Sequence, residues 1–134
     1  MTYLLKVAFA EAIAEFQKAV SLSPNFTDYK GGLGYAYAVA GDRAEARKLL
    51  EELKARSKQS YVPWFYIAGI YAGLGEKDQA IANLEKAYEQ HEQGLAVMKR
   101  EPMFDPLRSD ARFQGLLRRM NLPIDSTNSG ISHN

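Results

Sequence analysis

The chain has 134 residues, of which 46% are hydrophobic and 25% are charged, as in an average soluble globular domain. Its formal net charge of +1 gives no strong field for attracting nucleic acid or an anionic membrane, so neither is an expected partner. The absence of cysteine excludes disulfides, thiolate nucleophiles and cysteine-bound metal sites. No apolar run reaches the ~20 residues needed to cross a bilayer, and no signal-peptide pattern is seen, so we expect a cytoplasmic protein.

The first expected element is one continuous helix over about residues 2–22. No glycine interrupts this segment, and Val7 occupies the place that Gly41 and Gly75 hold in the two segments that follow. Its apolar residues follow a helical stripe: Leu5, Phe9, Ala12, Phe16, Ala19 and Val20.

The next two segments, residues 27–60 and 61–94, each predict a pair of antiparallel helices. The expected helices span residues 27–40, 43–57, 61–74 and 77–91, with Pro24 and Pro63 in the connections. Alanine recurs every 34 residues, at Ala12, Ala46 and Ala80. Bulky and small apolar residues follow at offsets of four and seven, which define one face of a helix: Phe16, Leu50, Leu84, Ala19, Leu53 and Ala87.

The first helix of each pair has its own repeated pattern. Leu33, Gly34 and Tyr37 correspond to Ile67, Ala68 and Tyr71, and Trp64 precedes Ile67 by three residues. With the 34-residue period, this pattern resembles the tetratricopeptide repeat. The resemblance implies an all-α fold, an α-solenoid of antiparallel helix pairs. We expect Gly34 to face Ala46, and Gly41 and Gly75 to end helices in the left-handed conformation.

The C-terminal segment departs from the repeat. A short helix is expected near residues 93–100, Pro102 and Pro106 should then break the chain, and Ser109 should cap a final helix over residues 110–120. We therefore expect a single domain over residues 1–122, with a partial repeat (1–26), two repeats (27–60, 61–94), a C-terminal capping helix in residues 95–122, and a flexible tail (123–134). Residues 104–120 also resemble the ending of bacterial tetratricopeptide regions that regulate an effector domain, which implies a regulatory, bacterial context.

No residue pattern predicts catalysis, a cofactor or a metal site, so we expect no enzyme. His91 and His133 have no carboxylates at metal-ligand spacing. The Gly31–Gly34 run lacks the strand and the Lys-Ser or Lys-Thr of a phosphate loop, so reduced helix crowding explains it better. Asp105 and Asp110 have the surroundings of capping residues. The basic run Arg108, Arg112, Arg118 and Arg119 lacks aromatic interleaving, which favours end-cap packing over nucleic-acid binding.

The resemblance further implies a concave face lined by the first helix of each repeat. Seven residues are expected to line this groove: Asp28, Tyr35, Val39, Val62, Phe65, Tyr66 and Gly69. The Lys, Asn and Arg of the family's carboxylate clamp are absent, so we expect a partner peptide or helix of apolar or aromatic character. We expect Tyr35 and Phe65 to be replaceable by alanine without unfolding, with loss of binding. The alternative that these rings pack against neighbouring helices stays open.

Self-association is the alternative function. The partial repeat leaves an apolar stripe without its partner helix, made of Leu4, Leu5, Phe9, Ile13 and Phe16. Such a stripe would pack across a two-fold axis in a homodimer. A frayed first helix is the other interpretation of the same residues.

Overall fold

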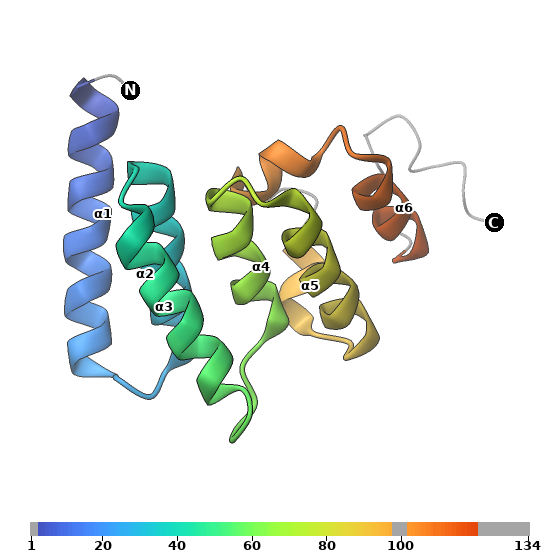
Figure 1. The fold of residues 1–134 in the computed structure, drawn as a ribbon, viewed down its shortest axis with the longest axis horizontal. Helices are drawn as coiled ribbons and strands as arrows, with labels where there is room; N and C mark the ends of the chain where they lie inside the picture. Colours follow the sequence, from blue (N-terminus) through green and yellow to red (C-terminus); the bar gives the residue numbers. More distant parts are fainter. Residues whose placement is uncertain (1–2, 98–101, 121–134) are drawn as a thin grey trace.

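The computed structural model describes residues 3–97 and 102–120, and every regular element in those ranges is helical. The elements are α1 (Tyr3–Leu22), α2 (Thr27–Ala40), α3 (Arg43–Arg56), α4 (Trp64–Gly73), α5 (Lys77–Glu89), two short 3-10 helices η1 (Gln93–Val97) and η2 (Pro102–Leu107), and α6 (Ala111–Arg119). The α-helices follow one another from α1 on the left to α6 on the right, while η2 lies next to α4 (Figure 1). The predicted all-α solenoid of helix pairs is confirmed.

Helix α1 runs without interruption, as the sequence predicts. It packs along α2, where the Phe16 ring fills the space left by Gly32: a Cβ built there would lie 2.5 Å from Cε1 of Phe16. The Gln17 side chain donates a hydrogen bond to the Tyr37 hydroxyl at 2.7 Å. The N-terminal turns of α1 extend beyond the connection between α2 and α3 (Figure 1). The two ends of α1 therefore have different surroundings.

Each first helix ends in the same glycine turn. Gly41 and Gly75 have φ angles of +93° and +81°, which confirms the predicted left-handed conformation. In both turns the next amide reaches back to a tyrosine carbonyl: Asp42 N donates to Tyr37 O, and Glu76 N donates to Tyr71 O, each at 2.9 Å. These bonds satisfy carbonyl groups that the helix end would otherwise leave without donors.

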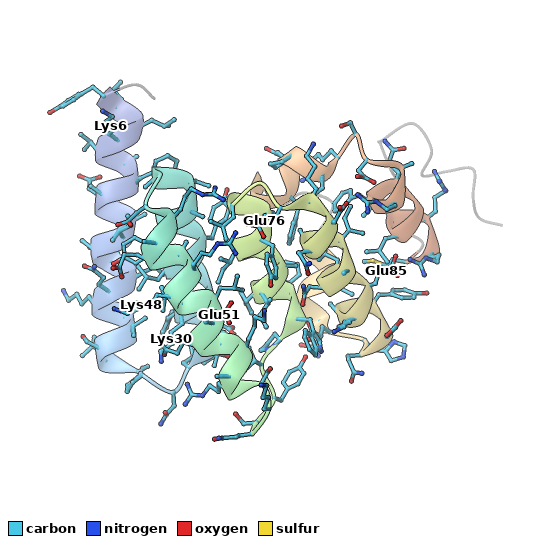
Figure 2. The ribbon with its side chains drawn as sticks, viewed as in Figure 1. Lys6, Lys30, Lys48, Glu51, Glu76 and Glu85 are labelled. Atoms are coloured by element: carbon cyan, nitrogen blue, oxygen red, sulfur yellow. The ribbon has the colours of Figure 1, made fainter. Side chains whose placement is uncertain are left out.

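Glu76, at the turn between α4 and α5, also ties the two repeats together (Figure 2). Its carboxylate forms an ion pair with Arg47 and a longer one with Arg43, both from α3. The Arg43 side chain also donates to the Leu74 carbonyl at 2.9 Å. Arginines of one repeat thus bind the turn of the next.

The repeated small and large positions form the core. All six residues that recur at 34-residue spacing in α3 and α5 are fully buried: Ala46, Leu50, Leu53, Ala80, Leu84 and Ala87. The expected partner of Gly34 was wrong. A Cβ built there would meet Ile70 of α4, with Cδ1 at 2.6 Å, so the open side of Gly34 faces the next repeat rather than Ala46.

The C-terminal segment differs most from the prediction. Proline is accepted in the first turn of a helix, where its missing N–H has no partner to lose, and Pro102 begins η2. Pro106 lies inside η2 rather than breaking the chain. Helix α4 starts at Trp64, after Pro63, and not at residue 61. Asp110, not Ser109, caps α6, because its carboxylate accepts the Arg112 amide at 2.8 Å. Residues 98–101 and the tail, with His133, lie outside the described residues.

Candidate interaction surface

The contact between α2 and α4 is built from side chains that rest on glycines of the facing helix. A Cβ built at Gly31 would lie 2.6 Å from Cβ of Tyr66, and one at Gly73 would lie 3.1 Å from the Tyr35 ring. Two of the predicted groove residues, Tyr35 and Tyr66, therefore pack against the neighbouring helix. The glycines of the Gly31–Gly34 run allow this close approach, which agrees with the interpretation from the sequence.

The middle of the predicted groove is covered by the chain itself. The η2 segment lies against α4, where Met103 contacts the Gly69 position and the Phe104 ring meets the Phe65 ring edge-on at 5.2 Å. Phe65 is 4% exposed and Val62 is 2% exposed. Val62, Phe65 and Gly69 are buried in this structure, and Phe65 still borders the hollow described next; that they line a binding groove stays a prediction. Phe65→Ala would remove core packing, so it does not separate binding from folding.

A hollow of about 470 Å³ remains open beside this covered face. It lies among the start of α2, residues 61–66 and the turn after α5. Its lining is Asp28, Tyr61, Pro63, Phe65, Tyr66, Gln90, His91, Glu92, Gln93 and Gly94. The hollow brings together Asp28, Phe65 and Tyr66 from the predicted groove, and it leaves Tyr35 and Val39 outside, both half-buried. A volume of this size is typical of clefts that bind small groups.

Glu92 organises one wall of the hollow, and the sequence analysis missed it. One carboxylate oxygen accepts the Phe65 amide at 2.9 Å, and the other accepts the Trp64 amide at 2.7 Å and the Tyr61 hydroxyl at 2.5 Å. Pro63 has no side-chain acceptor, so Glu92 supplies the N-terminal cap of α4 from the end of the same repeat. Burial, and then the bond to Glu92, raise the pKa of Tyr61 above its usual range. The sequence offered one signal for such a cap: Pro63 precedes the helix start and cannot cap it with its own side chain.

The opposite wall joins the two first helices. The Tyr66 hydroxyl of α4 donates to the Asp28 carboxylate at the start of α2, at 3.0 Å. On the rim, His91 adopts φ +56°, a left-handed conformation that is uncommon for residues other than glycine. Tyr61 is 62% exposed beside it. The hollow thus offers carboxylates and aromatic rings on a hydrogen-bonded frame.

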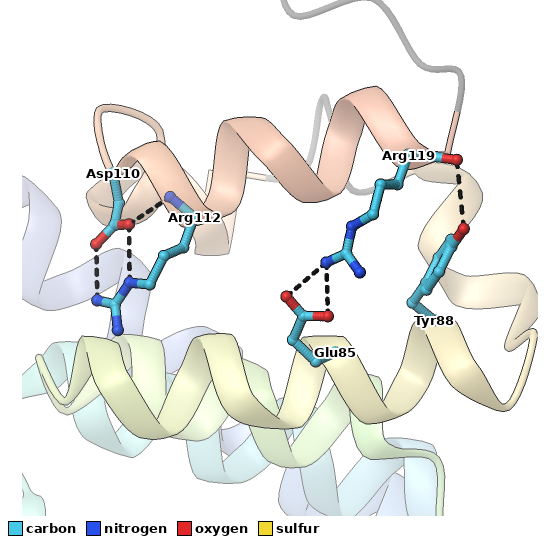
Figure 3. Close-up of polar contacts among 5 residues, drawn as sticks. All are labelled: Glu85, Tyr88, Asp110, Arg112 and Arg119. Atoms are coloured by element: carbon cyan, nitrogen blue, oxygen red, sulfur yellow. Dashed lines mark hydrogen bonds and ion pairs between the residues drawn. The ribbon is translucent and has the colours of Figure 1, made fainter.

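Arginines of the predicted basic run form ion pairs around the end cap. Arg112 binds Asp78 and Asp110, both at 2.9 Å. Figure 3 shows the pair with Asp110 and the pair of Arg119 with Glu85, at 2.6 Å. Tyr88 also donates to the Arg119 carbonyl at 3.4 Å, and Arg108 binds Asp105 at 2.7 Å. Hydrogen bonds from the Arg112 side chain and amide lower the pKa of Asp110 to about 2. These contacts attach α6 to α5, as the end-cap interpretation predicts.

The predicted self-association stripe is divided along α1. Leu4 is 78% exposed and Leu5 is 47% exposed. Phe9, Ile13 and Phe16 are half-buried, and Phe16 rests on Gly32 of α2. The stripe therefore has an exposed N-terminal part and a half-buried C-terminal part.

Within residues 3–97 and 102–120, no three or more histidine, cysteine, aspartate or glutamate side chains gather where they would hold a metal ion. Among the described helices, none combines the length and the apolar character that crossing a membrane requires.

Comparisons with known proteins agree with the repeat geometry. Two sequence models described as tetratricopeptide repeat match the chain, one over residues 7–64 and the other over residues 63–90. Superkiller protein 3 of Schizosaccharomyces pombe is 31% identical over 78 residues, which are 58% of this chain, and the match spans only 6% of the yeast protein. No solved structure matches the chain significantly. Residues 7–90 thus carry tetratricopeptide repeats, which generally mediate protein–protein interaction and are typically non-catalytic.

Proposed function

We propose that this protein is a non-catalytic scaffold that binds a peptide or helix of a partner protein. The observation that carries the proposal is the open hollow of about 470 Å³ at the starts of α2 and α4. First helices of repeats form the binding surfaces of solenoids, and here the neighbouring part of that surface is already filled by η2. A partner would dock over the hollow, against the exposed ring of Tyr61 and the edge of Tyr66.

The role of such a scaffold would be regulatory. The support is the resemblance of residues 104–120 to the ending of bacterial regulatory regions, and in this chain that ending forms the cap that covers α4. A bacterial origin and a cytoplasmic location belong to the same proposal.

A photo-crosslinking residue placed at Tyr61 tests the docking site. Tyr61 lines the hollow. Lys48, which is exposed on α3 and labelled in Figure 2, serves as the matched control. We expect one partner to be crosslinked from the Tyr61 position, identified by mass spectrometry and then reproduced with the purified partner. Equal crosslinking from both positions, or none from Tyr61, would contradict docking at the hollow.

Homodimerisation is the second candidate. The exposed N-terminal part of α1 favours it, because Tyr3 and Leu4 are each 78% exposed on a helix that extends beyond its neighbours (Figure 1). Light scattering behind a sizing column is expected to give twice the monomer mass, and Leu4→Glu is expected to restore the monomer. Glu11→Gln, also exposed on α1, is the control. A monomer at the highest attainable concentration would rule this candidate out.

A further inference from the structure

We propose that the hollow receives a positively charged side chain, arginine or lysine, from the partner segment. This inference rests on the proposed function, because it names the chemistry of the partner that docks there. The sequence alone predicts an apolar or aromatic partner, and the residues that line the hollow change that expectation.

The charge of the lining is negative. Asp28 and Glu92 contribute carboxylates, and among the lining residues that the structure describes there is no lysine or arginine. Glu92 accepts three hydrogen bonds within the described residues, and none of the three donors is a cationic side chain, so its charge is oriented but not cancelled by them. The carboxylate of Asp28 accepts one bond, from a neutral tyrosine.

Two basic residues close to the hollow along the chain are engaged elsewhere. Lys30, which follows Asp28 in the first turn of α2, forms an ion pair with Glu52 of α3. Arg56, at the end of α3, donates to the Asn25 side chain at 3.0 Å. Neither of these two side chains pairs with Asp28, and in this proposal the cation comes from the partner.

The aromatic rings favour the same kind of group. Tyr61 is exposed at the rim and Tyr66 forms the wall, and faces of such rings attract ammonium and guanidinium groups. The chain uses this contact within its own fold: Lys86 lies 4.6 Å from the centre of the Trp64 ring, and Arg119 lies 5.2 Å from that of Tyr88. A cation in the hollow would combine carboxylate and ring contacts, as guanidinium groups commonly do.

The size of the hollow limits what enters. A volume of about 470 Å³ accommodates one long side chain with its adjoining backbone, but not a helix. The partner would therefore insert one side chain, while the rest of its segment lies on the surrounding surface.

The probe is a pair of short peptides titrated into the full chain, with backbone amide shifts followed by NMR. One is acetyl-Gly-Leu-Arg-Leu-Gly-amide, and the other carries citrulline, the neutral isostere of arginine. We expect the arginine peptide to shift amides at residues 28, 61, 66 and 91–94, and to bind about tenfold more tightly than the citrulline peptide. Raised salt should weaken the arginine peptide only.

Two variants keep the experiment decisive. Asp28→Asn retains an acceptor for the Tyr66 hydroxyl and removes the charge, so it should reduce the preference for arginine over citrulline while circular dichroism stays unchanged. Glu11→Gln, on α1 away from the hollow, should leave the preference intact. Equal binding of both peptides, or shifts confined to other surfaces, would overturn the inference. A partner that still crosslinks at Tyr61 would then leave the proposed function standing.

Discussion

At the scale of single residues, the glycines differ in what surrounds them. Gly31 faces Cβ of Tyr66 at 2.6 Å, an atom fixed by the backbone of α4, whereas Gly34 faces Cδ1 of Ile70, the flexible end of a side chain. At Gly115 in α6 the nearest atom lies 4.0 Å away. The same change to alanine should therefore have different effects at the three positions.

We expect Gly115→Ala to stabilise the protein by about 0.5–1 kcal/mol, because alanine loses less conformational entropy in a helix. Gly31→Ala should be destabilising, since overpacking costs roughly 1–3 kcal/mol and exceeds the helical gain. Gly34→Ala should fall between them. Urea unfolding followed by the fluorescence of Trp64, the single tryptophan, measures all three. An equal effect at Gly31 and Gly115 would show that the contact between α2 and α4 is packed less tightly than these distances indicate.

Asp110 predicts a pH dependence. Because hydrogen bonds from Arg112 lower the pKa of its carboxyl from 3.8 to about 2, the folded state binds this proton less readily than the unfolded chain. The stabilisation is present at pH values above the usual pKa of 3.8, and it is lost as the pH falls toward the lowered pKa of about 2. We expect the melting temperature of Asp110→Asn to fall less steeply than that of the wild type over this interval. Ser109→Ala should keep the wild-type slope, because Ser109 does not cap α6.

At the scale of elements, α4 depends on a cap from the far end of its own repeat. Glu92→Ala leaves the Trp64 and Phe65 amides without their acceptor, and the loss of a helix cap costs about 0.5–2 kcal/mol. We expect a destabilisation in this range by urea unfolding. Gln90→Ala, an exposed change on the same turn, is the control and should be close to neutral. Equal stability of the two variants would contradict the capping role.

At the scale of the whole molecule, the C-terminal segment is part of the core. Phe104, Leu107 and Phe113 are fully buried in the same cluster as Phe65 and Leu84. We expect Phe104→Ala to destabilise the protein by about 3–5 kcal/mol. Trp64 fluorescence and far-ultraviolet circular dichroism should still report the same midpoint. Leu22→Ala, at a residue that is 75% exposed, is the control. Two separate transitions in Phe104→Ala would instead show a cap that detaches by itself.

Local patterns predicted the repeats well, and contacts between distant segments were not predictable in the same way. The 34-residue spacing of Ala46 and Ala80 predicted the helix pairs, because helix packing follows from periodicity. Gly41 and Gly75 predicted the turns, because glycine readily adopts the left-handed backbone conformation. The burial of Phe65 depends on Phe104, which lies in the 3-10 helix η2, where the two prolines predicted a break. Glu92 reaches α4 across 28 residues, and no spacing rule relates a cap to a helix start at that separation.

The alternating contacts between α2 and α4 also restrict motion. Tyr66 and Ile70 project from α4 onto Gly31 and Gly34, while Tyr35 projects from α2 onto Gly73. Sliding either helix by one turn, about 5.4 Å, would drive rings into side chains instead of glycines. The starts of the two helices therefore keep a constant separation. An incoming chain would meet a rigid surface, and little of its binding free energy would be lost in ordering the receptor.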